Sequence, residues 1–278
     1  MRFVMNRLKL FKISWNEIVT NRKGIIFFVG IMTLFVVWFL TIFDPTLFAE
    51  MEAVFESYPE VIKEMVGGQI SIGTFGGFIN TYIFEFAWMY FGIYVLMKAS
   101  QDIPKEIEDK TIDIIMSKPI NRWEFVIGKY LRHIGVALFL SVCTALGIIL
   151  GIFAFPNINP TEINLDEVIF VVFWFYLFLV AIISTGFFFS TFLSTKKALG
   201  AGFGMLVLFF AFGSFWGAMP EAMESVKFFS IFYYFDPFDL LVNHNWGIVW
   251  LHVIILGIYS IVITIIAGFI FNKRDIPV

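Results

Sequence analysis

Hydrophobic and polar positions alternate on a long scale along this chain, with six apolar stretches separated by polar segments. A bilayer core is about 30 Å thick, and a helix needs roughly 20 apolar residues to cross it. The stretches have that length, and they cover residues 24–43, 78–97, 134–155, 168–190, 199–219 and 248–271. The pattern predicts an all-α integral membrane protein with six transmembrane helices, in which residues 1–278 form a single transmembrane domain.

The composition agrees with lipid as the surrounding solvent. Hydrophobic residues make up 59% of the 278 residues, 38 residues are Phe, and only 15% are charged. The mean hydropathy is +0.86, which is typical of membrane proteins rather than soluble domains. The net charge of −3 gives no indication of a nucleic-acid partner. Cys143 is the only cysteine, so the chain forms no intrachain disulfide.

The distribution of basic residues predicts the orientation. Of the 19 Lys and Arg residues, all but Lys63 and Lys227 lie before the first stretch, after the second, after the fourth or after the sixth. Cytoplasmic loops of multi-pass proteins carry the excess of Lys and Arg. We therefore expect both termini in the cytoplasm, and we expect the loops at residues 44–77 and 220–247 on the outer side.

The N-terminal residues 1–23 have a helical pattern of their own. Apolar side chains recur at helical spacing, at Val4, Leu8, Phe11, Trp15 and Ile18. Basic residues lie largely off this stripe, so the segment is predicted to be an interfacial helix on the inner membrane surface, with membrane lipid as its partner.

The cytoplasmic segment at residues 98–133 joins the second and third stretches. Asp102 is suited to cap a helix that has Pro104 in its first turn, and Pro119 would end that helix. Along it, Ile107 and Ile114 fall on one face. The pattern predicts a short, two-faced helix beneath the membrane.

A second helix is predicted to start directly afterwards. Asn121 and Glu124 have the spacing of a capping box, and the helix that they begin would continue into the third stretch. The preceding short helix carries acidic as well as basic residues. Anionic lipid would attract it poorly, so a protein partner fits better.

The residues needed for several kinds of chemistry are missing. Gly128 and Lys129 lack the upstream glycine of a nucleotide-binding loop, because position 123 is Trp. The histidines are not paired at metal-ligand spacing; they are His133, His244 and His252. The sequence predicts no catalytic residue, no metal site and no cofactor.

Glu85 is the one carboxylate well inside an apolar stretch. An ionised group at mid-membrane costs about 2.5–3.5 kcal/mol on insertion scales, so Glu85 should face protein or water. Two interpretations stay open. The carboxyl lines a translocation path or accepts a proton, or it is protonated and bonded to a neighbouring helix.

The cytoplasmic segment resembles the coupling region of type 2 ABC exporter permeases. The matching positions are Glu106, Glu108, Thr111, Asp113, Ser117, Pro119, Arg122 and Lys129. The six-span order, the basic N-terminal helix and the large first outer loop are also similar, and the chain looks closest to permeases of prokaryotic multidrug, peptide and copper-maturation exporters.

This resemblance implies a partner arrangement. It implies a second permease, either an identical copy or a paralogue, and two separate ATPase subunits that bind beneath and push on the cytoplasmic helix. It also implies a multi-pass protein of a prokaryotic plasma membrane, and it favours export. The eight matching residues would form the coupling and ATPase-contact region.

Two other functions compete with the ABC permease. A proton-coupled secondary transporter would use Glu85, but it should carry a second intramembrane charge that the sequence does not show. A membrane enzyme or assembly factor is the third hypothesis, and it would need paired catalytic groups.

Overall fold

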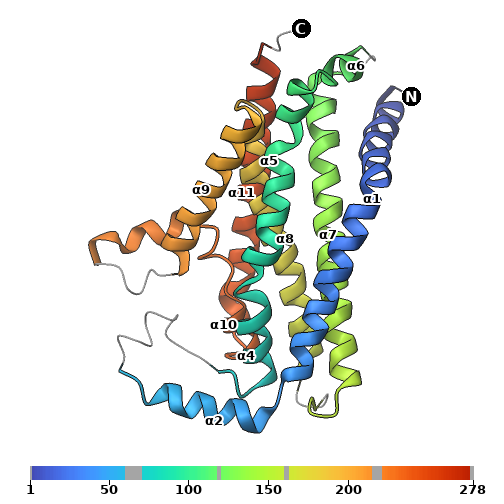
Figure 1. Cartoon of the computed structure of the whole chain (residues 1–278). Coiled ribbons are helices and arrows are strands. Elements are labelled where there is room, and N and C mark those ends of the chain that lie inside the picture. Colours follow the sequence, from blue (N-terminus) through green and yellow to red (C-terminus); the bar gives the residue numbers. More distant parts are fainter. Residues whose placement is uncertain (1, 60–70, 118–119, 160–162, 215–220, 276–278) are drawn as a thin grey trace.

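A computed structural model describes residues 2–59, 71–117, 120–159, 163–214 and 221–275, and Figure 1 shows a bundle of helices. Within these ranges every regular element is a helix, which confirms the all-α class. The elements are α1 (Arg2–Ile42), α2 (Pro45–Glu56), α4 (Phe75–Ile79), η1 (Asn80–Phe84), η2 (Trp88–Gly92), α5 (Ile93–Glu108), α6 (Ile112–Met116), α7 (Arg122–Ala154), α8 (Leu165–Ser190), α9 (Thr195–Ser214), η5 (Glu221–Phe229), α10 (Pro237–Leu241) and α11 (Trp246–Lys273).

Among the described residues, five helices are long and apolar enough to cross a membrane. They are the Arg22–Ile42 part of α1 together with α7, α8, α9 and α11. These helices correspond to five of the six predicted spans.

The second predicted span, at residues 78–97, is helical but irregular. α4 leads into the π-helical segments η1 and η2 and then into α5, and this path stands among the other helices in Figure 1. At the end of η1 the Glu85 N–H donates to the Asn80 carbonyl, five residues earlier, at 2.8 Å. Glu85 thus directly follows a π-helical turn, a feature that is frequent at functional sites.

The helix α8 forms the centre of the bundle. It packs against α5, α7, α9 and α11, while α1 lies against α7. Trp174, Phe175 and Phe178 are fully buried on it. A helix that is apolar on all sides belongs in the interior of a bundle. The large apolar residues that α1 and α11 leave exposed, such as Phe27 and Ile261, are suited to face lipid.

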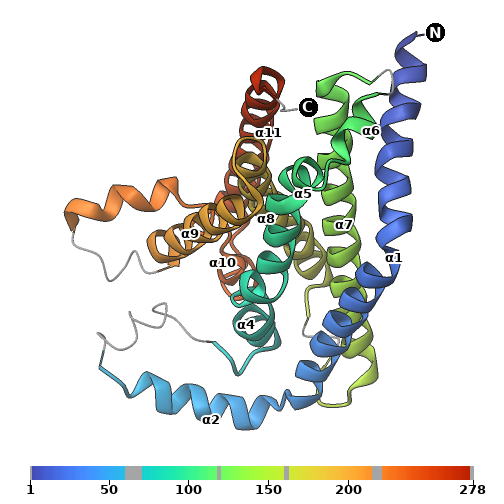
Figure 2. The same cartoon turned by 45° about the horizontal axis from the view of Figure 1, so that its top comes forward.

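The two ends of the bundle differ. Figures 1 and 2 show α6, the beginning of α1 and the end of α11 at one end, whereas α2 lies across the other end. This arrangement agrees with a cytoplasmic α6 and an outer α2, as the basic residues predict.

Residues 2–42 form one continuous helix. The predicted interfacial helix at residues 1–23 is therefore joined to the first span without a break. Its placement on the membrane surface stays a prediction.

The prediction that a helix begins at Asp102 is wrong. Asp102 and Pro104 lie inside α5, which continues from the second span to Glu108. Val95, Ala99 and Ile103 are fully buried along this helix. Burial of that face and the contacts of the Asp102 side chain outweigh the local preference of Asp and Pro for a helix start.

The chain instead breaks after Glu108. Lys110 has a φ of 56°, the left-handed conformation, and the Thr111 N–H donates to the Glu106 carbonyl at 3.0 Å. Together with the bond from the Lys110 N–H to the Ile107 carbonyl at 3.2 Å, this is a Schellman motif. The two-faced helix is thereby reduced to the five residues of α6.

The predicted start of the next helix is confirmed. Asn121 caps α7, and the Glu124 carboxylate accepts a hydrogen bond from the Asn121 backbone N–H at 3.0 Å. The helix then continues through the third span to Ala154. One continuous helix therefore runs from Arg122 through the third predicted span.

Candidate functional site

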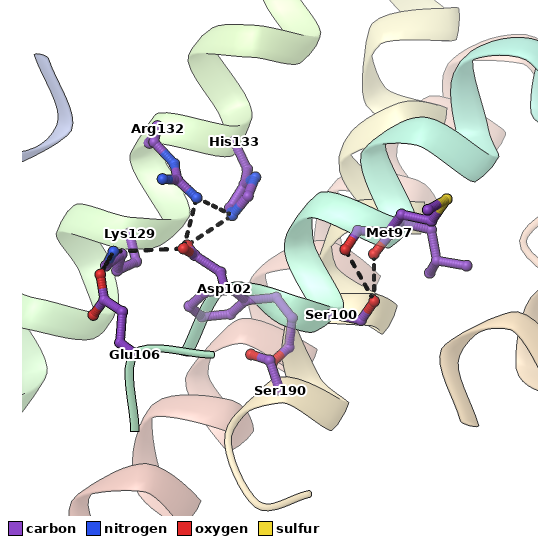
Figure 3. A network of polar contacts seen from close by, with 10 residues as sticks. Met97, Ser100, Asp102, Glu106, Lys129, Arg132, His133 and Ser190 are labelled. Carbon is purple, nitrogen blue, oxygen red and sulfur yellow. Dashed lines mark hydrogen bonds and ion pairs between the residues drawn. The ribbon is translucent and has the colours of Figure 1, made fainter. Parts of the chain in front are cut away.

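Five ionisable side chains from α5 and α7 meet at the end of the bundle that carries α6. α5 supplies Asp102 and Glu106, which lie one turn apart, and α7 supplies Lys129, Arg132 and His133. Residues three and four apart share one face of a helix. Figure 3 shows these two faces turned toward each other. We call these five residues the charge cluster.

Asp102 is the centre of the charge cluster. Its Oδ1 lies 2.7 Å from Arg132 Nη2 and 3.4 Å from Lys129 Nζ. Its Oδ2 lies 2.9 Å from His133 Nε2. Lys129 Nζ also pairs with Glu106 Oε1. The acidic and basic groups of α5 and α7 are thus joined across the helix interface (Figure 3).

The charge cluster is buried and balanced. Only 2% of the Lys129 side chain and 6% of the Asp102 side chain are exposed. Burial by itself raises the pKa of the Asp102 carboxyl, but Arg132, His133 and Lys129 outweigh it and hold that pKa well below its usual range. Two carboxylates therefore face two cations. Buried charges are tolerated when they are paired in this way, and loss of one partner is costly.

Glu108 joins the turn after α5 to α9. Its Oε1 accepts a hydrogen bond from the backbone N–H of Thr195, the first residue of α9, at 2.9 Å. This bond lowers the pKa of the Glu108 carboxyl. A carboxylate is favoured at a helix N-terminus because unpaired N–H groups point toward it.

Arg122 joins the start of α7 to the end of α11. Its guanidinium donates to the Arg274 carbonyl at 2.6 Å and to the Asn272 carbonyl at 3.1 Å. Arg274 in turn donates to the Thr191 carbonyl at the end of α8, at 2.9 Å. The ends of α7, α8 and α11 on the α6 side of the bundle are therefore connected.

α6 borders a surface groove of about 590 Å³. Asp113 is exposed in the first turn of α6 and lines the groove. The Ser117 N–H donates to the Asp113 carbonyl at 2.9 Å, and the Thr111 hydroxyl donates to the Glu106 carbonyl at 3.3 Å. Pro119 lies outside the described residues.

The predicted positions thus separate into two groups. Glu106, Glu108, Arg122 and Lys129 connect helices at the α6 end of the bundle, whereas Asp113 and Ser117 are exposed on and beside α6. Glu85 belongs to neither group, because it lies between η1 and η2, on the exposed surface of the isolated chain.

Sequence reasoning missed Arg132 and His133, and it treated Asp102 only as a helix cap. The sequence does contain a pattern that could have predicted the cluster. The acidic residues Asp102 and Glu106 are spaced i, i+4 before the turn, and the basic residues of the cluster are spaced i, i+3, i+4 after it. Among the described residues, no group of three or more His, Cys, Asp or Glu is arranged to hold a metal ion.

The family model described as ABC-2 family transporter protein matches residues 8–276, nearly the whole chain. No curated protein and no solved structure matches the chain.

Proposed function

The chain belongs to the ABC-2 transporter family and is the multi-pass permease component of an ABC transporter. We propose that ATP hydrolysis outside this chain drives its transport cycle. ATP is hydrolysed by separate ATPase subunits, which bind beneath two permeases and push on α6. The second permease is an identical copy or a paralogue. The assembly lies in a prokaryotic plasma membrane with both termini in the cytoplasm, and it exports its substrate.

The observation that carries this proposal is the attachment of α6 to two long helices. α6 follows α5 through the turn at Lys110 and precedes α7, which is capped at Asn121. The charge cluster joins α5 to α7 above it. A force on α6 would therefore move α5 and α7 together, because the charge cluster joins these two helices.

The contacts of Glu108 and Arg122 spread the same movement. Glu108 joins the turn to α9, and Arg122 joins α7 to α11. In this arrangement Glu106, Glu108, Arg122 and Lys129 transmit the movement, while Asp113 and Ser117 face the ATPase. The resemblance groups these residues together, and their different contacts are the reason to assign them different roles.

Charge reversal at Asp113 tests this assignment. In the complex co-expressed with its ATPase, Asp113→Lys should reduce the ATPase that co-purifies in mild detergent, because a reversed interfacial charge costs about 2–5 kcal/mol. Asp275→Lys is a matched control, since Asp275 is exposed at the same end of the bundle. Equal ATPase recovery from the wild-type and Asp113→Lys complexes would contradict the role of α6.

Weakening the cap at the start of α7 should have a different effect from reversing a charge on α6. Asn121→Gly removes the side chain at the start of α7 but leaves the exposed face of α6 intact. We expect an assembled complex that still hydrolyses ATP, while a spin label at Asn164 on the outer side no longer responds to nucleotide. An unchanged response would show that the force does not pass through α7.

A further inference from the structure

A cavity of about 290 Å³ lies at the cytoplasmic side of the bundle, between α1, α5, α7 and α8. One part of its wall is basic and consists of Lys23, Lys98 and Arg132. Another part is apolar and consists of Ile25, Val136 and Ile183. Among the described residues that line the cavity, none is acidic. The cavity is thus suited to a ligand with both an anionic and an apolar part.

The three basic residues stand at the ends of predicted spans. Lys23 directly precedes the first apolar stretch, Lys98 directly follows the second, and Arg132 stands two residues before the third. Three helices therefore place a cation where the inner leaflet changes from hydrocarbon to headgroup. Lys23 and Lys98 are exposed, so their ammonium groups are accessible from the membrane surface.

Arg132 connects the cavity to the charge cluster. Its Nη2 is bound to Asp102, and a guanidinium has further N–H donors in the same plane. Lysine and arginine are the side chains that bind phosphate groups through charge-assisted hydrogen bonds.

We propose that this cavity binds the phosphate group of an anionic phospholipid from the inner leaflet. The phosphate lies among Lys23, Lys98 and Arg132, and the acyl chains run along the apolar wall of Ile25 and Val136. The site shares Arg132 with the charge cluster, whereas Lys23 and Lys98 belong neither to that cluster nor to α6.

Binding is measured by native mass spectrometry of the full chain in mild detergent, with three ligands titrated separately. We expect phosphatidylglycerol to bind at least about tenfold more tightly than phosphatidylcholine, because attraction to anionic lipid is worth about one kcal/mol per nearby Lys or Arg. Inorganic phosphate should neither bind comparably nor displace phosphatidylglycerol. Equal binding of the two lipids, or displacement by millimolar phosphate, would overturn the proposal.

Two variants locate the site. The double variant Lys23→Gln, Lys98→Gln should weaken phosphatidylglycerol binding by roughly tenfold or more. Its control is Lys196→Gln, Lys197→Gln, which removes two exposed cytoplasmic lysines outside the cavity. If the two double variants bind phosphatidylglycerol equally, the lipid is held elsewhere.

Gly24 offers a steric test that leaves the charges unchanged. It lines the cavity, and a Cβ added there meets nothing within 4 Å, so Gly24→Leu should fold and occupy the space. Gly30→Leu is the control, since Gly30 is equally open but does not line the cavity. Loss of lipid binding in Gly24→Leu alone supports the site, and equal binding by both variants refutes it.

Discussion

Removal of the Asp102 charge is the most direct perturbation of the charge cluster. Asp102→Asn keeps the shape of the side chain and one carbonyl oxygen, but it removes the carboxylate that pairs with both Lys129 and Arg132. Lys129 is nearly inaccessible to water, with 2% of its side chain exposed, so solvent cannot replace the lost partner. The charge cluster loses one of its two negative charges.

The magnitude follows from these distances and this burial. At about 3 Å and an effective dielectric constant of about 20, one charge pair is worth about 5 kcal/mol before the cost of desolvation. Breaking a buried pair by removing one partner costs about 3–5 kcal/mol. We therefore expect Asp102→Asn to lower the free energy of unfolding by about 3–5 kcal/mol. Asp275→Asn, at an exposed position, should change it by less than about 0.5 kcal/mol.

The assay is thermal unfolding of the purified protein in mild detergent, combined with hydrogen exchange of residues 98–133. A double-mutant cycle distinguishes the ion pair from general damage. In the double variant Asp102→Asn, Lys129→Met, one cation is removed together with one carboxylate. Its loss of unfolding free energy should therefore be smaller than the sum of the two single losses by at least about 1 kcal/mol. Additive losses, or an Asp102→Asn variant as stable as the wild type, would refute the reasoning.

Three further predictions concern separate parts of the chain. Lys110 has a φ of 56°, so Lys110→Gly should raise the free energy of unfolding by about 0.5–1 kcal/mol, and Lys110→Val should lower it. Stabilisation by Val would contradict the left-handed turn. In a Cys143→Ser background, single cysteines at Ser57 and Asn164 should react with an impermeant thiol reagent in intact cells, whereas a cysteine at Lys110 should react only after permeabilisation; labelling at Lys110 from outside would invert the topology. Glu85→Gln should leave membrane insertion intact and reduce ATP-driven transport in vesicles more than Glu85→Asp does, if the carboxyl lines a translocation path or accepts a proton. Wild-type transport by the Gln variant would assign Glu85 a structural role.

The membrane-spanning pattern was predictable because the constraint is local. Each helix that faces lipid needs its own continuous apolar stretch, and its backbone bonds are satisfied within the helix. For this reason five predicted spans reappear as long helices. The second span was predicted in place but not in its π-helical form, because η1 and η2 depend on close packing; a Cβ on Gly92 would lie 2.9 Å from Ile182 on α8.

Helix ends show the same contrast. The start of α7 was predictable because its capping contact is local. The Asn121 backbone N–H donates to the Glu124 carboxylate within one helical turn. The end of α5 was not, because Lys110 occupies a position where Gly or Asn is the usual signal. Asp102 was misread as a cap for a further reason. Its partners Arg132 and His133 lie 30 and 31 residues away along the chain.

The sequence by itself determined the fold class, the number and positions of the apolar stretches and the resemblance that the family match confirms. These features follow from composition and short-range spacing, which need no knowledge of neighbours in space. Only the tertiary structure decided that α5 and α7 turn their charged faces toward each other, that Glu108 reaches α9, and that Arg122 reaches α11. The packing of both α5 and α7 against α8 sets which faces meet, and no local pattern along the chain encodes that choice.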